Sequence, residues 1–187
     1  MPMPDSVKRF LRHSWDNLQI IVIALAAAFF VRYFIAQPFL VSGASMEPSF
    51  HDGNFLIVDE LTYRLKEPER GDVIVFKYPG NEKEYFIKRI IGIPGETIVT
   101  SGDVITITAQ DGTMTTLVEP YIKPDLRIAE NKSVTLSEKE YFVMGDNRGN
   151  SFDSRSWGPL NQKEITGLVR LRVFPFNEFG ITPDVTY

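Results

Sequence analysis

The chain has 187 residues, of which 43% are apolar, and it carries a formal net charge of −4. This length accommodates one membrane anchor and one compact domain. The chain has no cysteine, which excludes disulfides and thiolate chemistry. The acidic residues outnumber the basic ones after the N-terminal region, and this balance argues against a nucleic-acid partner.

The first elements expected along the chain are a basic flank, residues 1–16, and an apolar segment, residues 17–36. A helix needs about 20 residues to cross the hydrocarbon core, so residues 17–36 suffice for a transmembrane anchor if Arg32 lies near one interface. The basic residues before this segment predict a cytoplasmic flank, with residues 37–187 on the outer face of the cell membrane. A cleaved secretory signal peptide and a buried soluble helix are the alternatives for this segment.

Short β-branched and aromatic runs separated by turn dipeptides predict an all-β domain of antiparallel sheets over residues 37–187. The expected strands cover residues 55–58, 73–76, 85–91, 104–108, 114–118, 134–136, 141–144 and 168–174. Residues 61–66 suggest one helical turn. The apolar content thins over residues 97–140, which indicates a smaller inserted β subdomain. The predicted fold class is therefore mostly β, with one N-terminal helix.

Two residues, Ser45 and Lys88, are candidates for nucleophilic catalysis. A serine hydroxyl needs an adjacent base, but His13 lies in the cytoplasmic flank and His51 lies in a turn close to Ser45 in sequence. Lysine is protonated at its ordinary pKa, which is near 10.4, but burial among apolar groups can lower that pKa by several units. Taken alone, Lys88 is also compatible with an ordinary strand lysine whose amine reaches solvent.

The strand around Lys88 supplies apolar surroundings, because alternate residues of a strand share a face and Phe86, Lys88 and Ile90 therefore point together. A third segment, residues 145–158, is rich in hydrogen-bonding side chains. It suits an ordinary loop, since the same residue types dominate turns. It does not suit a calcium loop, because Arg148 occupies a ligand position and no glutamate closes the repeat.

Together, these segments resemble type I signal peptidases, the membrane-bound serine proteases of the Ser/Lys class. The resemblance rests on residues 42–48 (SGASMEP), 70–76 (RGDVIVF), 85–95 (YFIKRIIGIPG) and 145–158 (GDNRGNSFDSRSWG). It implies that Ser45 is the nucleophile, that Lys88 is the general base, and that the hydroxyl of Ser151 hydrogen-bonds and orients the lysine amine.

The resemblance also implies structural ion pairs, Arg89 with Asp146 and Asp153 with Arg155. Gly43 stands where Gram-negative members of the family carry a serine whose hydroxyl helps to form the oxyanion hole. The chain is therefore similar to the Gram-positive form, and its oxyanion hole is expected to depend on the backbone N–H of Ser45.

The substrate implied by the resemblance is the signal peptide of a translocated preprotein, cleaved after small residues in the A-x-A pattern. Candidates for the substrate pocket are Met46, Phe86 and Ile90. No metal or cofactor is expected, and the partners are signal peptides and the lipid bilayer. Two other functions are compatible with the sequence: a self-cleaving Ser/Lys protease of the repressor type, and a non-catalytic, membrane-tethered β domain that binds a partner.

Overall fold

The computed structural model of the protein describes residues 15, 17–27, 29, 36–102, 104–122 and 131–182. Within these residues the β-strands form two sheets, and every strand pair is antiparallel. The predicted mostly-β, antiparallel architecture is therefore confirmed.

The larger sheet has the strand order β1-β2-β11-β3-β4-β9-β10, with β12 paired to β11. Its strands are β1 (Ala36–Leu40), β2 (Phe55–Asp59), β3 (Val73–Tyr78), β4 (Asn81–Gly92), β9 (Glu140–Met144), β10 (Leu160–Asn161), β11 (Ile165–Phe174) and β12 (Gly180–Ile181). Because β9 lies beside β4, the polar loop that follows β9 comes close to the strand that carries Lys88.

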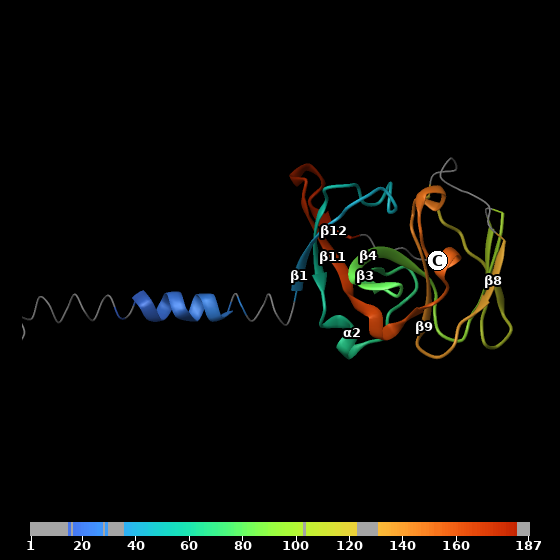
Figure 1. Cartoon of the computed structure of the whole chain (residues 1–187), viewed down its shortest axis with the longest axis horizontal. Helices are drawn as coiled ribbons and strands as arrows, with labels where there is room; N and C mark the ends of the chain where they lie inside the picture. Colours follow the sequence, from blue (N-terminus) through green and yellow to red (C-terminus); the bar gives the residue numbers. More distant parts are fainter. Residues whose placement is uncertain are drawn as a thin grey trace, which may run out of the picture.

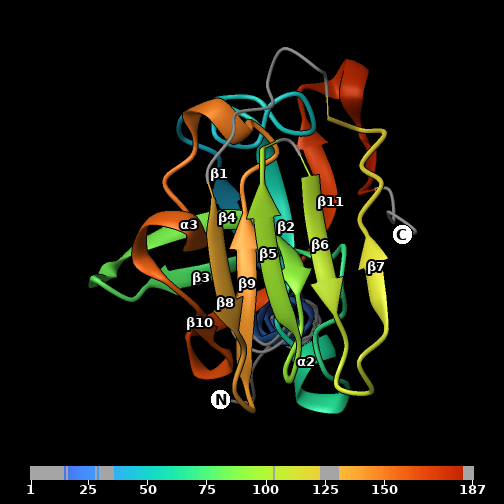
Figure 2. The ribbon, with the colours of Figure 1, turned by 90° about the vertical axis from the view of Figure 1, so that its right-hand side faces the viewer.

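The smaller sheet has the strand order β7-β6-β5-β8 and is built from the part of the chain between β4 and β9. Its strands are β5 (Thr97–Ser101), β6 (Val104–Thr108), β7 (Met114–Thr116) and β8 (Lys132–Thr135). Figure 1 shows this sheet on the side of the domain opposite β1, and Figure 2 looks onto it directly.

Short helical turns connect the strands: α2 (Thr62–Leu65), η2 (Arg148–Asn150), α3 (Ser154–Trp157), η3 (Gln162–Glu164) and η4 (Phe176–Glu178). The start of α2 is fixed by Asp59, whose Oδ1 accepts hydrogen bonds from the backbone N–H groups of Leu61 and Thr62 at 2.8 and 3.0 Å. Asp153 caps α3 in the same way, since its Oδ1 accepts a hydrogen bond from the backbone N–H of Arg155 at 3.2 Å. These carboxylates satisfy N–H groups that the first turn of a helix leaves unpaired.

Strand β3 is buried on both faces of the larger sheet. Val73 and Val75 pack into a cluster on one face, and Ile74 and Phe76 pack into a second cluster on the other. Successive strand side chains point to opposite faces, so an uninterrupted apolar run is what a strand covered on both sides requires. A third cluster joins the two sheets; it consists of Ile91, Ile98, Ile105, Ile107, Leu117, Leu136, Phe142 and Met144. The second half of strand β4, which pairs with β3, is thus held in a packed interior.

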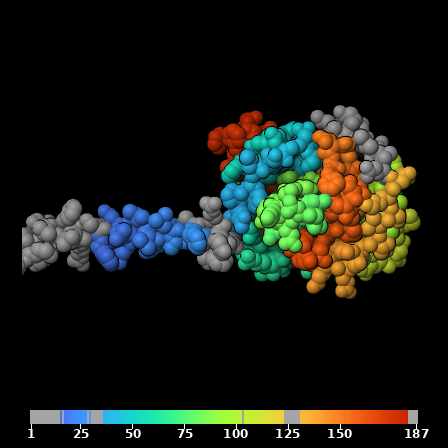
Figure 3. All heavy atoms as spheres, in the orientation of Figure 1, coloured from blue at the N-terminus to red at the C-terminus, as the bar shows by residue number. Residues whose placement is uncertain are grey.

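The N-terminal segment contains helical residues 17–27, whose apolar side chains are exposed (Figure 3). In the part of the chain that the structure describes, no helix combines the length and apolar character needed to cross a membrane. Residues 1–14, 16, 28 and 30–35, which make up most of the predicted flank and part of the predicted anchor, lie outside the described residues.

Candidate active site

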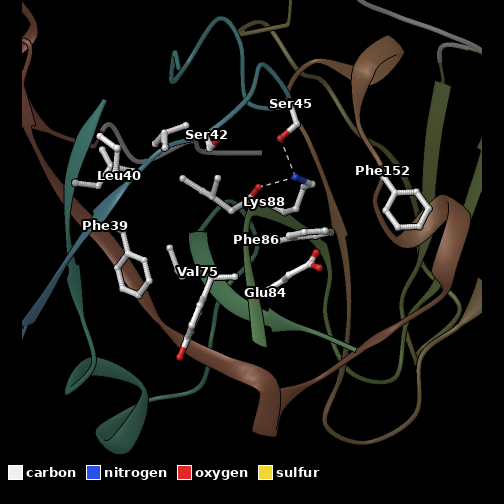
Figure 4. A pocket seen from close by; sticks show the side chains of 13 residues that line it. Phe39, Leu40, Ser42, Ser45, Val75, Glu84, Phe86, Lys88 and Phe152 are labelled. Atoms are coloured by element: carbon white, nitrogen blue, oxygen red, sulfur yellow. Dashed lines mark hydrogen bonds between the residues drawn. The ribbon is translucent and has the colours of Figure 1, made fainter. Parts of the chain in front are cut away.

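Ser45 and Lys88 are in direct contact. Ser45 lies in the turn segment after β1, and Lys88 lies on β4 opposite Ile74 of β3, where β4 enters the interior. The Nζ of Lys88 is 2.8 Å from the Oγ of Ser45 and donates a second hydrogen bond to the carbonyl oxygen of Ile87, also at 2.8 Å (Figure 4). At this distance a proton can pass directly between the hydroxyl and the amine.

Burial determines the charge state of Lys88, whose surface is only 4% exposed. Loss of hydration disfavours the ammonium form and lowers the pKa of Lys88 from its ordinary value of 10.5 to about 8. The carboxylates of Asp153 and Asp146 act in the opposite direction and raise this pKa. Lys88 is therefore a base that can be neutral close to physiological pH.

Each of these two carboxylates is itself paired with a buried arginine. Asp146 accepts hydrogen bonds from the Nε and Nη2 of Arg89 at 2.9 and 2.7 Å, and Asp153 accepts from the Nε of Arg155 at 2.8 Å. Burial would raise the pKa of Asp153, but its hydrogen bonds with Arg155 and with the backbone N–H of Gly145 hold that pKa below the ordinary value. Pairing with the arginines weakens the pull of both carboxylates on the Lys88 proton.

Ser151 lies next to Ser45 across Gly145. A Cβ atom at Gly145 would overlap the Oγ of Ser151 and the carbonyl oxygen of Ser45, so both residues touch the glycine backbone. The Ser151 hydroxyl is buried and lies close to the Asp153 carboxylate, whose pKa it helps to lower. The hydrogen bond expected between Ser151 and Lys88 is not formed; the Lys88 amine instead hydrogen-bonds to the Ser45 Oγ and the Ile87 carbonyl oxygen.

The loop after β9 also holds the Ser45 segment by two hydrogen bonds from Asn147. Its backbone N–H donates to the carbonyl oxygen of Ser45, and its side-chain Nδ2 donates to the carbonyl oxygen of Ala44, both at 3.1 Å. Sequence reasoning did not single out Asn147, and its only signal was its position within the polar loop.

The backbone at Gly43 adopts a conformation that is rare for other residues. Gly43 has a φ of +95°, in the left-handed region that favours glycine, and its N–H donates to Oδ1 of Asp52 at 2.8 Å. The N–H of Ser45 donates to no acceptor within the described ranges. Of these two amides, that of Gly43 is engaged within the protein, and that of Ser45 has no internal acceptor among the described residues.

A pocket of about 510 Å³ opens beside the two residues (Figure 4). Its lining residues come from β1 and the segment after it, from β2 and β3, from β4 and from the loop after β9: Phe39, Leu40, Val41, Ser42, Ser45, Leu56, Val75, Glu84, Tyr85, Phe86, Ile87, Lys88 and Phe152. The ring of Phe86 lies 5.4 Å from the Nζ of Lys88 and stacks on Tyr78 at a centroid distance of 4.8 Å. The pocket therefore begins at the reactive atoms.

Of the three pocket candidates, Phe86 lines the pocket, whereas Met46 and Ile90 do not. Both are fully buried, Met46 in the cluster with Val41 and Phe50, and Ile90 in the opposite cluster. Ile90 shares its strand face with Phe86, as expected, but that face is already covered by the core at Ile90.

Residues 14–174 match the model of the family described as signal peptidase, peptidase S26. The chain belongs to this family. Signal peptidase I of Bacillus amyloliquefaciens is 36% identical over 187 residues, covering 95% of this chain and 94% of the relative. Signal peptidase I T of Bacillus subtilis strain 168 is 37% identical over 172 residues, covering 87% of this chain and 86% of the relative.

A crystal structure of a signal peptidase I from Enterococcus faecalis V583 is 31% identical to this chain. The match has a TM-score of 0.47 and covers 55% of this chain and 97% of that one. As a member of a signal peptidase family, the protein is a hydrolase that cleaves peptide bonds, which argues against the non-catalytic interaction domain.

Among the residues that the structure describes, no ionisable side chain other than Lys88 hydrogen-bonds to the Ser45 hydroxyl. His51 is exposed and lies 3.6 Å from the carboxylate of Glu47. Among the described residues, no group of three or more histidine, aspartate or glutamate side chains is arranged as metal ligands. Within the described residues, Lys88 is the basic side chain that contacts Ser45.

Proposed function

We propose that the chain is a membrane-bound serine endopeptidase that removes N-terminal signal peptides from exported preproteins, with Ser45 as nucleophile and Lys88 as general base. The observation that carries the proposal is the 2.8 Å contact between a buried lysine amine and a serine hydroxyl at the edge of a pocket. Membership in the signal peptidase family supports the choice of substrate.

Acylation starts from neutral Lys88. Its amine takes the proton of the Ser45 hydroxyl while the Oγ attacks the carbonyl carbon of the scissile bond, and a tetrahedral intermediate forms. A lysine with a pKa of about 8 is neutral in roughly one molecule in ten at pH 7. If Lys88 had its ordinary pKa, its neutral fraction at pH 7 would be roughly several hundred times smaller. Burial therefore makes the base usable.

The negative charge of the tetrahedral intermediate needs a fixed donor. The free N–H of Ser45 is suited to this role, and the hydrogen bond from Gly43 to Asp52 holds the preceding turn in place. Losing one such donor costs other proteases about 10²–10³ in kcat. The unpaired backbone N–H of Ser45 therefore supports an oxyanion hole built chiefly from the backbone, since Gly43 has no side chain that could donate.

The proton that Lys88 has taken from Ser45 is needed to release the first product. The ammonium group gives this proton to the leaving amine as the C–N bond breaks, which leaves an ester on Ser45. A water molecule then attacks the ester and transfers a proton to Lys88, which returns it to the Ser45 Oγ. The hydroxyl of Ser151 does not hydrogen-bond the lysine amine, so the proposed cycle assigns it no orienting role.

The pocket supports cleavage after small residues. In an extended substrate, alternate side chains point the same way, so the first and third residues before the scissile bond face one wall. Aromatic and branched side chains line the pocket, such as Phe39, Phe86 and Ile87, and they restrict the space available to those residues. Such a lining favours alanine over larger side chains at these two positions, and this is the basis of the proposed A-x-A preference.

The first test uses the detergent-solubilised full chain and a preprotein with an A-x-A site. We expect cleavage at that site by the wild type, and a loss of at least about 10³-fold in Ser45→Ala, because the nucleophile is gone. Ser101→Ala, which changes an exposed serine on β5, serves as the matched control and should cleave at the wild-type rate. Preproteins with leucine at the first or third position should resist cleavage. Wild-type activity in Ser45→Ala would refute the proposal.

Membrane attachment is proposed through residues 17–36. The helical residues 17–27 expose their apolar side chains, which soluble proteins normally bury. The short distance in sequence between this segment and Ser45 suits a substrate that emerges from the outer face of the same membrane.

Deletion of residues 1–36 tests this attachment. The shortened protein is expected to appear in the soluble fraction after cell lysis, whereas the full chain should sediment with membranes and resist extraction by carbonate. If the full chain is extracted by carbonate, it is not anchored by a spanning segment, and the proposed location is wrong.

A further inference from the structure

The segment that leaves the smaller sheet after β7 contacts the loop that carries Ser151. Leu117 still pairs with β6, because its N–H donates to the carbonyl oxygen of Ile105 at 2.8 Å. Two residues on, the Glu119 carboxylate forms a two-pronged ion pair with the guanidinium of Arg148, with both N–O distances at 2.5 Å. Both side chains are more than nine-tenths buried. The smaller sheet is thus joined by a buried ion pair to the loop after β9.

A second contact from the same segment reaches the buried pair of Arg89 and Asp146. The ring of Tyr121 lies 4.5 Å from the guanidinium carbon of Arg89, within the range of a cation–π interaction. The hydroxyl of Tyr121 donates to Oε1 of Glu119 at 2.7 Å, so the carboxylate is held from two sides. The contact with Tyr121 therefore helps to hold the Glu119 carboxylate in the position from which it binds Arg148.

Arg148 transmits this constraint toward the reactive atoms. Its Nε donates to the carbonyl oxygen of Gly145 at 3.0 Å, in addition to the ion pair with Glu119. Gly145 touches both the Oγ of Ser151 and the carbonyl oxygen of Ser45. A continuous series of contacts therefore leads from Glu119 through Arg148 and Gly145 to the nucleophile.

We propose that Glu119 is a positioning residue that holds Arg148 and thereby seats residues 145–151 against Ser45 and Lys88. This inference rests on the proposed roles of Ser45 and Lys88. The smaller sheet then supports catalysis without touching the substrate. A buried ion pair usually adds little net stability compared with apolar residues of similar size, because both charges lose hydration. The planar fork instead fixes the direction in which Arg148 points, and this is what a positioning role requires.

The test compares Glu119→Gln with Glu96→Gln in the full chain. Glu96 is also buried and paired with an arginine, Arg70, but no contact joins that pair to residues 145–151 among the described residues. For both variants, kcat and KM on the preprotein, the pH midpoint of kcat, and thermal unfolding are measured. Both variants should unfold at a lower temperature than the wild type.

Only Glu119→Gln should change the chemistry. We expect its kcat to fall by about 10- to 100-fold with little change in KM, because a misplaced catalytic group slows the reaction without weakening binding. The pH midpoint should move upward, since a looser loop admits water to Lys88 and restores part of its hydration. Asp146 and Asp153, the charged groups that face Lys88, keep their arginine partners in this variant.

Three outcomes separate this inference from the proposed function. If Glu119→Gln and Glu96→Gln share the wild-type kcat and pH midpoint, Glu119 has no positioning role. If Glu119→Gln does not fold, Glu119→Asp replaces it, since the shorter side chain keeps the charge but cannot hold the fork without moving the loop; wild-type kcat in that variant also overturns the inference. An active Ser45→Ala variant would instead contradict the proposed function.

Discussion

Replacing Lys88 by methionine is expected to abolish cleavage while making the folded protein more stable at neutral pH. Cleavage is lost because the general base is removed, and such a base contributes about 10²–10⁴-fold to the rate. Stability rises because the folded protein no longer holds a buried ammonium group. The pKa of Lys88 lies near 8 instead of 10.5, a difference that corresponds to a penalty on the order of 3 kcal/mol for the charged form.

This penalty can be measured from the way the free energy of unfolding changes with pH. Below pH 8 the lysine is protonated in both the folded and the unfolded chain, so the penalty is fully present. Between about 8 and 10.5 the unfolded chain binds a proton that the folded chain does not, and the free energy of unfolding therefore rises with pH. Lys88→Met should lack this rise, and its advantage over the wild type should fade across the same interval.

The measurements are urea unfolding from pH 7 to 10.5 and cleavage of the preprotein over pH 6 to 9. Wild-type activity should increase with pH as Lys88 becomes neutral, with a midpoint near its pKa of about 8. Lys83→Met is the control, because Lys83 lies on the same strand but is exposed. It should match the wild type in activity and stability. A less stable Lys88→Met variant at pH 7 would show that burial does not penalise the charged amine.

Strand segments with a sustained apolar pattern could be predicted from the sequence, whereas an exposed polar segment and a segment containing a proline could not. The run at residues 73–76 is apolar throughout because both faces of β3 are covered. The first half of β4 was missed, since Asn81 to Tyr85 are exposed and carry no apolar pattern. Strand β1 was missed for another reason: it contains Pro38 and continues an apolar run assigned to the anchor. It lies at the edge of the sheet, where a proline displaces no ladder hydrogen bond.

The chemistry of the site was more predictable than its surroundings. Lys88 could be nominated because the histidines were unsuitable and its strand neighbours were apolar. The residues that line the pocket could not be predicted in the same way. A strand pattern shows which residues share a face of the sheet, but it does not show what covers that face. Ile90 illustrates this limit, since it shares the face of Phe86 yet is covered by the core. Glu119 gave no sequence signal at all, because its contact with Arg148 depends on how the smaller sheet meets the loop after β9.

Gly145→Ala is expected to lower kcat by about 10²-fold, although it adds only a single methyl group. The added Cβ would overlap the Ser151 hydroxyl and the carbonyl oxygen of Ser45. The backbone cannot move away easily, because the Gly145 N–H donates to Asp153 at 3.0 Å and its carbonyl oxygen accepts from Arg148 at 3.0 Å. Ser45 or Ser151 must therefore shift, and a shift of Ser45 disturbs its contact with Lys88.

A second glycine separates this local effect from a general loss of stability. Gly180→Ala places its Cβ in open space on β12 and requires no left-handed backbone, so it should keep the wild-type kcat. Overpacking costs about 1–3 kcal/mol in a packed interior, and Gly145→Ala should remain folded at 25 °C if the loss stays in that range. Its KM should change less than its kcat, since the substrate pocket is lined by other residues. A folded Gly145→Ala variant with wild-type kcat would mean that the close packing of Ser45, Gly145 and Ser151 is not needed for the reaction.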